Sequence, residues 1–206
     1  KGNPPWAAQG LHPMAMEAFL KMQAAAKADG IALELVSGYR SYDRQRSIWN
    51  RKYKRFTSEG MSGSEAIQKI ITYSTLPGTS RHHWGTDIDI TDGKIPKEGD
   101  ILVAEKFHDG GPYEPLRLWM ETHAKDFGFL LVYTNDPNRK GFAYEPWHYS
   151  YTPLSNSYFK AFMEINLTDL VSDNSLEGAI HLDTAFLRDY KNQQILDVNP
   201  ALIDSQ

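Results

Sequence analysis

Segments with helical periodicity and segments with strand-like alternation follow one another along this chain without the strand–helix–strand repeat of a parallel sheet. After Pro13, apolar residues recur at helical spacing until Gly30, and a strand-like run, Ile31–Val36, follows. The next predicted elements are a helix from Ser41 to Tyr53, a helix behind the capping box Ser62–Glu65, a strand over Thr86–Ile90, a helix from Pro115 to Gly128, and a strand pair over Phe129–Tyr133 and Gly141–Tyr151. This order favours an α+β fold with a small antiparallel sheet flanked by helices.

The character of the sequence changes after Pro153. Two stretches with helical periodicity, Tyr158–Ile165 and Asp183–Leu196, are joined there by a polar segment. A chain of 206 residues suits one domain with an appendage. We therefore expect a core domain over residues 1–153 and a helical C-terminal extension over residues 154–206 that packs on it.

Composition excludes several classes of function. The net charge is −4, which offers no basic field for nucleic acid, and no apolar run is long enough to span a membrane. The chain has no cysteine, so it has no thiol nucleophile, disulfide or cysteine zinc site. Any metal must therefore be bound by His, Asp and Glu, a ligand set that suits zinc. The first residues, KGNPPW, are neither a signal peptide nor an initiator methionine, which favours a processed chain.

The turn and strand at Pro77–Ile90 concentrate potential metal ligands. His82 lies in the turn, and Asp89 lies six intervening residues later on the predicted strand. A strand holds a carboxylate rigidly, and the turn can bring the imidazole over it. Taken alone, such a pair is a weak signal and is more often a pair of solvated loop residues than a metal site.

A second short segment supplies the residue types that this pair lacks. Catalytic zinc sites use three protein ligands, an open position for water and a base close to that water. Glu145 and His148 are three residues apart, and Pro146 favours a loop conformation for Glu145, so both side chains can converge. The alternative is an exposed glutamate and a packed histidine.

Arg40 falls between a strand end and a helix start, within Ser37-Gly-Tyr-Arg-Ser-Tyr-Asp-Arg-Gln45. Side chains at such junctions often project into a cleft. An arginine there can bind a carboxylate bidentately or offset the charge of an oxyanion. The alternative is an ordinary surface salt bridge.

The three motifs occur in a specific order. They read Ser-Gly-Tyr-Arg-Ser-x3-Gln, then Ser80-x-His-x2-Gly-x3-Asp89, then Glu145-x2-His148. In this order they resemble the VanY-type D-alanyl-D-alanine carboxypeptidases, which belong to the peptidoglycan metallopeptidases that share a metal core with lysostaphin and the hedgehog domain. The resemblance covers roughly Leu11 to Tyr151 and leaves the C-terminal extension unexplained.

The resemblance implies a role for each motif residue. His82, Asp89 and His148 would bind Zn2+, and Glu145 would activate the zinc-bound water. Arg40 would stabilise the polarised carbonyl or its oxyanion, while Gln45 and Ser80 would help to position the C-terminal end of the substrate. His83 lies outside this frame and is expected to pack beside the site.

This chain departs from the family pattern at Asp87, where the family commonly has a small residue, often alanine. Alternation along the strand puts Asp87 on the same face as Asp89. We expect Asp87 to be a hydrogen-bond partner of a metal ligand or of Arg40, and Asp89 to be the ligand.

The resemblance implies a zinc peptidase that removes the C-terminal D-alanine from peptidoglycan stem peptides in the periplasm or cell envelope of a bacterium, after loss of a signal peptide. A D,D-dipeptidase, an L,D-carboxypeptidase or an endopeptidase on the same scaffold stays open, because the loops around the cleft decide which peptide fits. A non-catalytic cell-wall binding module is a further alternative, although such a module has no need for Glu145.

Overall fold

The computed structural model describes residues 2–171 and 175–203. Its centre is a four-stranded sheet in the order β1-β2-β4-β3, formed by β1 (Leu33–Ser37), β2 (Asp87–Asp92), β4 (His148–Tyr151) and β3 (Phe129–Leu131). All three strand pairings are antiparallel. The predicted α+β fold with a small antiparallel sheet is therefore confirmed.

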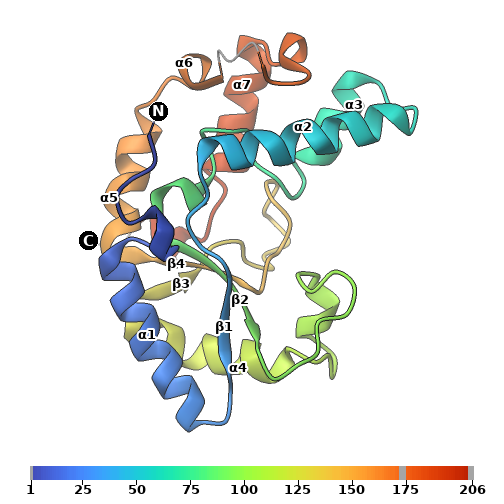
Figure 1. Ribbon diagram of the computed structural model, residues 1–206. Helices are drawn as coiled ribbons and strands as arrows, with labels where there is room; N and C mark the ends of the chain where they lie inside the picture. Colours follow the sequence, from blue (N-terminus) through green and yellow to red (C-terminus); the bar gives the residue numbers. More distant parts are fainter. Residues whose placement is uncertain (1, 172–174, 204–206) are drawn as a thin grey trace.

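One face of the sheet packs on helices α1 (Pro13–Ala28) and α4 (Glu114–His123) (Figure 1). Ile88 and Ile90 of β2 are fully buried in this apolar core, as the alternation along the strand predicted. Complete burial of such a side chain contributes about 1.5–3 kcal/mol. The intervening Asp87 and Asp89 consequently face the other side of the strand.

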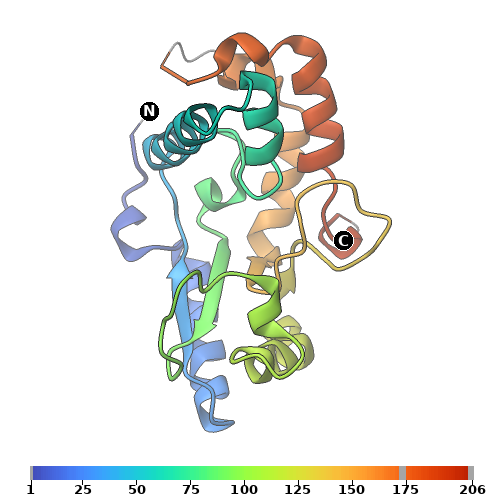
Figure 2. The same ribbon diagram turned by 90° about the vertical axis from the view of Figure 1, so that its right-hand side faces the viewer.

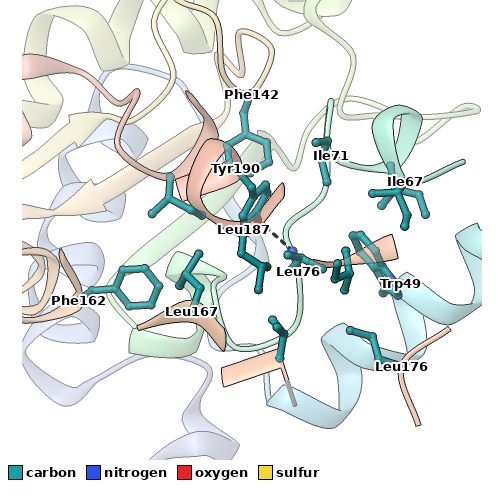
Figure 3. Packing of buried hydrophobic residues seen from close by; sticks show 14 of the residues in the cluster. Trp49, Ile67, Ile71, Leu76, Phe142, Phe162, Leu167, Leu176, Leu187 and Tyr190 are labelled. Carbon is teal, nitrogen blue, oxygen red and sulfur yellow. Dashed lines mark hydrogen bonds between the residues drawn. The ribbon is translucent and has the colours of Figure 1, made fainter. Parts of the chain in front are cut away.

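A second apolar core lies beyond the opposite side of the sheet. It joins α2 (Tyr42–Ser58) and α3 (Gly63–Ile70) to the C-terminal helices α5 (Thr152–Met163), α6 (Leu167–Val171) and α7 (Thr184–Tyr190). The hydroxyl of Tyr190 is buried there and accepts a hydrogen bond of 3.1 Å from the backbone N–H of Leu76 (Figure 3). Trp49 Nε1 of α2 donates to the carbonyl of Glu177 at 3.0 Å. The C-terminal segment thus packs against the helices that precede the candidate site, while the domain boundary after Pro153 stays a prediction.

Short helical turns complete the structure. The 3-10 turns are Ala7–Gln9, Arg81–Trp84, Ala104–Phe107, Ala124–Phe127, Ala179–His181 and Pro200–Leu202, and Lys191–Ile195 is a π turn. In the described part of the chain, no helix has both the length and the apolar character needed to cross a membrane.

Several element boundaries differ from the prediction. Helix α2 continues to Ser58, beyond the predicted end at Tyr53, and α5 begins at Thr152, before the predicted start at Tyr158, with Pro153 in its first turn. Only the end of the predicted strand Gly141–Tyr151 is a strand, β4 from His148, and its pairing with β3 begins at Tyr149. The residues before it pair elsewhere: the N–H of Gly141 donates to Asp197 Oδ2 at 2.6 Å, and that of Ala143 donates to the carbonyl of Thr72. Figure 2 shows this segment arching out beside the end of the chain.

Candidate active site

Adjacent segments of the fold bring the predicted metal ligands together. His82 lies in the 3-10 turn that immediately precedes β2, and Gly85 ends this turn with φ of 69°. A side chain at Gly85 would also meet the ring of Trp6 at 2.3 Å, so both the conformation and the packing require glycine. Asp89 on β2 is directly opposite His148 on β4 in the antiparallel register.

The side chains of His82, Asp89 and His148 form a compact, buried group. Each offers one ligand atom, and these atoms all lie within 4.8 Å of one another. His82 Nε2 is 3.2 Å from Asp89 Oδ2, and His148 Nδ1 is 3.8 Å from Asp89 Oδ1. Ligand atoms about 2.0–2.1 Å from a tetrahedral zinc ion lie roughly 3.3 Å apart, so these separations suit one metal ion.

The orientation of His82 is fixed by the strand end that precedes α2. Its Nδ1 donates to the carbonyl of Gly38 at 2.8 Å, because a carbonyl oxygen can only accept. Gly38 approaches Gly10 so closely that a Cβ would lie 2.1 Å from the Gly10 carbonyl oxygen, which excludes larger residues. In neutral His82, Nε2 therefore presents a lone pair towards Asp89, an arrangement that a cation between the two atoms stabilises.

His148 is oriented by carboxylates on both sides. Its Nε2 is 2.9 Å from Asp87 Oδ2, and its Nδ1 is 2.9 Å from Glu145 Oε2. Burial lowers the pKa of His148, but the hydrogen bonds to Asp87 and Glu145 and the nearby negative charges outweigh burial and raise the pKa to about 10. The surroundings of Nδ1 thus favour a positive charge, which either a proton or a metal ion can supply. Two imidazole nitrogens and one carboxylate fit zinc by type, number and spacing.

Asp87 is fully buried and lies behind His148. Besides His148 Nε2, its carboxylate accepts hydrogen bonds from Arg81 Nε at 2.8 Å and from Ser150 Oγ at 2.6 Å. Burial alone raises the pKa of Asp87, but the charge of Arg81 and the contact with His148 hold the pKa well below its usual range. Asp87 therefore contacts the imidazole of His148, and a metal ligand was one of its two expected partners. The other expected partner was Arg40, but the arginine that Asp87 binds is Arg81.

Sequence reasoning did not identify Arg81. Its guanidinium is buried, lies 4.7 Å from the Trp84 ring and neutralises Asp87. One of its terminal nitrogens, Nη1, has no hydrogen-bond partner among the residues that the structure describes. The signal was present in the sequence, since a basic residue inside the motif accompanies the unusual aspartate.

Arg40 points towards the grouped ligands. Its Nη1 donates to Gln45 Oε1 at 3.0 Å and its Nη2 to Ser37 Oγ at 3.0 Å, while Nη2 lies 3.8 Å from Asp89 Oδ2. His83 supports the backbone at this point, because its Nδ1 donates to the Arg40 carbonyl at 2.6 Å and its Nε2 accepts from the N–H of Gly78. Burial lowers the pKa of His83 to about 4, so the ring is neutral at physiological pH.

The two predicted substrate-positioning residues are placed differently. Ser80 is buried, with 2% of its surface exposed, and lines the cavity at the site. Gln45 is fully buried, and its amide nitrogen donates to the carbonyl of Thr75 at 2.8 Å while its oxygen accepts from Arg40. Any effect of Gln45 on the substrate must therefore pass through Arg40 or the Thr75 segment.

A cavity of about 840 Å³ opens onto these residues. Its lining includes all of the grouped ligands together with Arg40, Ser80 and Glu145. The volume lies in the range of sites that enclose small ligands, so it can accept a short peptide. Among the residues that the structure describes, His82, Asp89 and His148 form the one group of histidine and acidic side chains that could hold a metal ion.

The sequence of this chain is similar to that of a known protein family. Residues 8–154 match the family model of VanY, described as D-alanyl-D-alanine carboxypeptidase. A D-alanyl-D-alanine carboxypeptidase of Enterococcus faecalis is 30% identical over 131 residues, which cover 63% of this chain and 44% of that protein. The match thus spans less than half the length of this curated relative.

Two solved structures share the fold. VanYB in complex with D-alanine-D-alanine has a TM-score of 0.57 and 23% identity, over 80% of this chain and 83% of that chain. A variant of the vancomycin resistance D,D-pentapeptidase VanY in complex with Zn(II) has a TM-score of 0.56 and 23% identity, over 79% and 84%. With the family match over most of the chain, the protein belongs to the VanY family.

Proposed function

We propose that this protein is a zinc metallopeptidase that hydrolyses the C-terminal D-alanine from peptidoglycan stem peptides. The observation that carries the proposal is the buried group His82, Asp89 and His148 with Glu145 beside it, open to one cavity in a chain of the VanY family. The names of the relatives support the substrate class, and the Zn(II) complex of a structural neighbour supports the metal. An enzyme that acts on such substrates would work at the bacterial cell envelope.

His82 Nε2, Asp89 and His148 Nδ1 would hold the zinc ion. When bound, zinc supplies a Lewis acid that polarises a carbonyl and makes water acidic enough to react near neutral pH. Glu145 lines the same cavity, and its Oε2 is 2.9 Å from His148 Nδ1, which places it next to the ligand group. Glu145 is the general base: it accepts a proton from the attacking water and returns the proton to the leaving amine.

Arg40 is positioned to bind the substrate. Hydrogen bonds to Gln45 and Ser37 orient its guanidinium so that Nη2 lies near Asp89. The fork can donate to the oxygen of the scissile carbonyl as negative charge develops, or to the terminal carboxylate of the peptide. Ser80 lines the cavity beside His82 and can contact the same end of the substrate.

Replacement of Arg40 by lysine is expected to lower turnover about tenfold to a hundredfold, because lysine keeps the charge but loses the planar fork. Kinetics and thermal melting should be measured together. Arg46→Lys is the control, since Arg46 lies on α2 and pairs with Asp43 at 3.0 Å outside the cavity lining. Unchanged kinetics in Arg40→Lys would show that the residue has only a structural role.

Asp87 is proposed to position His148 without binding zinc. Asp87→Asn removes the negative charge but keeps a hydrogen-bond acceptor for His148, and we expect it to retain zinc and to weaken zinc affinity or activity about tenfold to a hundredfold. Asp87→Ala should in addition lower the melting temperature, because it leaves Arg81 buried without its carboxylate. Asp89→Ala should lose zinc. Zinc analysis of the folded variants checks this assignment, and zinc lost from Asp87→Asn but kept in Asp89→Ala reverses it.

Digestion of purified muropeptides by the zinc-loaded protein, with products identified by mass spectrometry, tests the proposed function. Release of one D-alanine from pentapeptides is the expected result. Release of D-alanine from tetrapeptides indicates an L,D-carboxypeptidase, cleavage of free D-Ala-D-Ala indicates a dipeptidase, and conversion of cross-linked dimers to monomers indicates an endopeptidase. If no muropeptide is altered, the protein is not this kind of peptidase, and a non-catalytic binding module becomes the better account.

A further inference from the structure

One face of α2 lines the cavity beyond the proposed zinc site. Ile48, Lys52, Arg55 and Phe56 are spaced four, seven and eight residues along the helix, and all four line the cavity. Lys69 of α3 extends the same wall. Figure 1 shows α2 on one side of this region and the segment that follows β2 on the other, and Asp100 and Glu105 of that segment line the opposite wall. The α2 wall of the cavity is therefore cationic.

The cations of this wall differ in their contacts. Arg55 lies over the Phe56 ring at 4.5 Å, with its Nε 3.7 Å from Glu59, and Lys69 covers the same ring at 4.5 Å. Lys52 is half-buried, yet within the described part of the chain neither a hydrogen bond nor an ion pair joins its ammonium to another group. Burial lowers the pKa of Lys52, and the positive charges of Arg55 and Arg40 lower it further. An anion at this position would relieve both effects.

Lys52 lies two helical turns beyond Gln45, which holds Arg40. Seven residues of α-helix correspond to about 10 Å along the axis. An extended peptide rises about 3.3 Å per residue, so this separation equals roughly three peptide residues. A carboxypeptidase releases a single residue at the C-terminal side of the cut bond. A group bound at Lys52 must then belong to the part of the peptide that precedes that bond.

We propose that Lys52 binds a second carboxylate of the peptide substrate, on a residue about three positions before the terminal D-alanine, and so selects peptides that carry an acidic group there. The inference rests on the proposed function for the identity of the peptide. It deepens that function by adding a residue that determines specificity. The ammonium donates to the carboxylate in a partly desolvated cavity, where a charged hydrogen bond is stronger than at an open surface.

The test uses two acetylated peptides that end in Lys-D-Ala-D-Ala and carry either glutamate or glutamine before the lysine. Their dissociation constants are measured by calorimetry on the zinc-loaded Glu145→Ala protein, which should bind without turnover. We expect the glutamate peptide to bind about tenfold more tightly than the glutamine peptide. Adding Lys52→Met should bring this ratio close to one without changing the affinity for the glutamine peptide.

Lys54→Met in the same background is the matched control. Lys54 is on the same helix, pairs with Glu177 at 3.1 Å and does not line the cavity, so the ratio should stay near its original value. The inference is overturned if the two peptides bind equally before Lys52 is changed, or if Lys52→Met leaves the ratio of their dissociation constants unchanged. It is also overturned if neither peptide binds. Turnover of the glutamine peptide by the protein with Glu145 intact tests the proposed function separately. Hydrolysis of that peptide together with a ratio of one means that only the role of Lys52 is wrong.

Discussion

Glu145→Ala is expected to keep the fold and the zinc ion and to lose about a hundredfold to ten-thousandfold in turnover, the usual contribution of a positioned general base. Glu145 is not among the three grouped ligands, although its carboxylate lies against His148 and in the same cavity. Its removal therefore takes away proton transfer and leaves the metal ligands in place. Zinc content, melting temperature and D-alanine release should be measured on the same preparation.

Glu105→Ala is the matched control for this variant. Glu105 lines the same cavity, but it is exposed and belongs to the opposite wall, so turnover should change little. If Glu145→Ala releases D-alanine at the parental rate, Glu145 is not the base. If both variants lose activity equally, the loss reflects the charge of the cavity as a whole and not proton transfer.

Alanine at His82, Asp89 or His148 is expected to abolish stoichiometric zinc binding. Each residue supplies one of the three protein ligands that a catalytic zinc site needs, and the two ligands left in each variant are too few to hold the ion. The expected zinc content is about one ion per chain for the parent protein and close to none for the variants, measured by plasma emission spectroscopy after dialysis.

His83→Ala is the control for the choice between the adjacent histidines. Both ring nitrogens of His83 are engaged, with the Arg40 carbonyl and the Gly78 N–H, and His83 is not among the grouped ligands. This variant should keep zinc, although the backbone at Arg40 loses a support. Zinc retained in His82→Ala and lost from His83→Ala would show that the motif was read one residue out of place.

The residues of the metal group were predicted from the sequence because the three motifs occur in an order that resembles one family, and each motif is a short local segment. His82 and Asp89 belong to one turn and strand, and Glu145 and His148 to one short segment. The contact between the two halves could not be derived from periodicity. It depends on the pairing of β2 with β4 in the register that sets Asp89 opposite His148, and residues far apart in the chain determine that register.

The orientation of each imidazole could not be predicted from the sequence either, because it also depends on residues far apart in the chain. The nitrogen that His82 presents follows from the carbonyl of Gly38, and the nitrogen that His148 presents follows from Asp87. Likewise, Gln45 belongs to the motif, but its burial depends on the Thr75 segment, which packs on it from 30 residues away. A motif identifies residue types, and tertiary packing decides which atoms face the cavity.

Titration of metal-free protein with zinc, followed by release of D-alanine from a peptide ending in D-Ala-D-Ala, tests the central claim most directly. The account predicts that metal-free protein is inactive and that activity rises in proportion to added zinc until about one ion per chain is bound. It also predicts that His148→Ala shows no such rise under the same conditions. D-alanine release by the metal-free protein at the rate of the zinc-loaded protein, or a full zinc response in His148→Ala, would contradict the account.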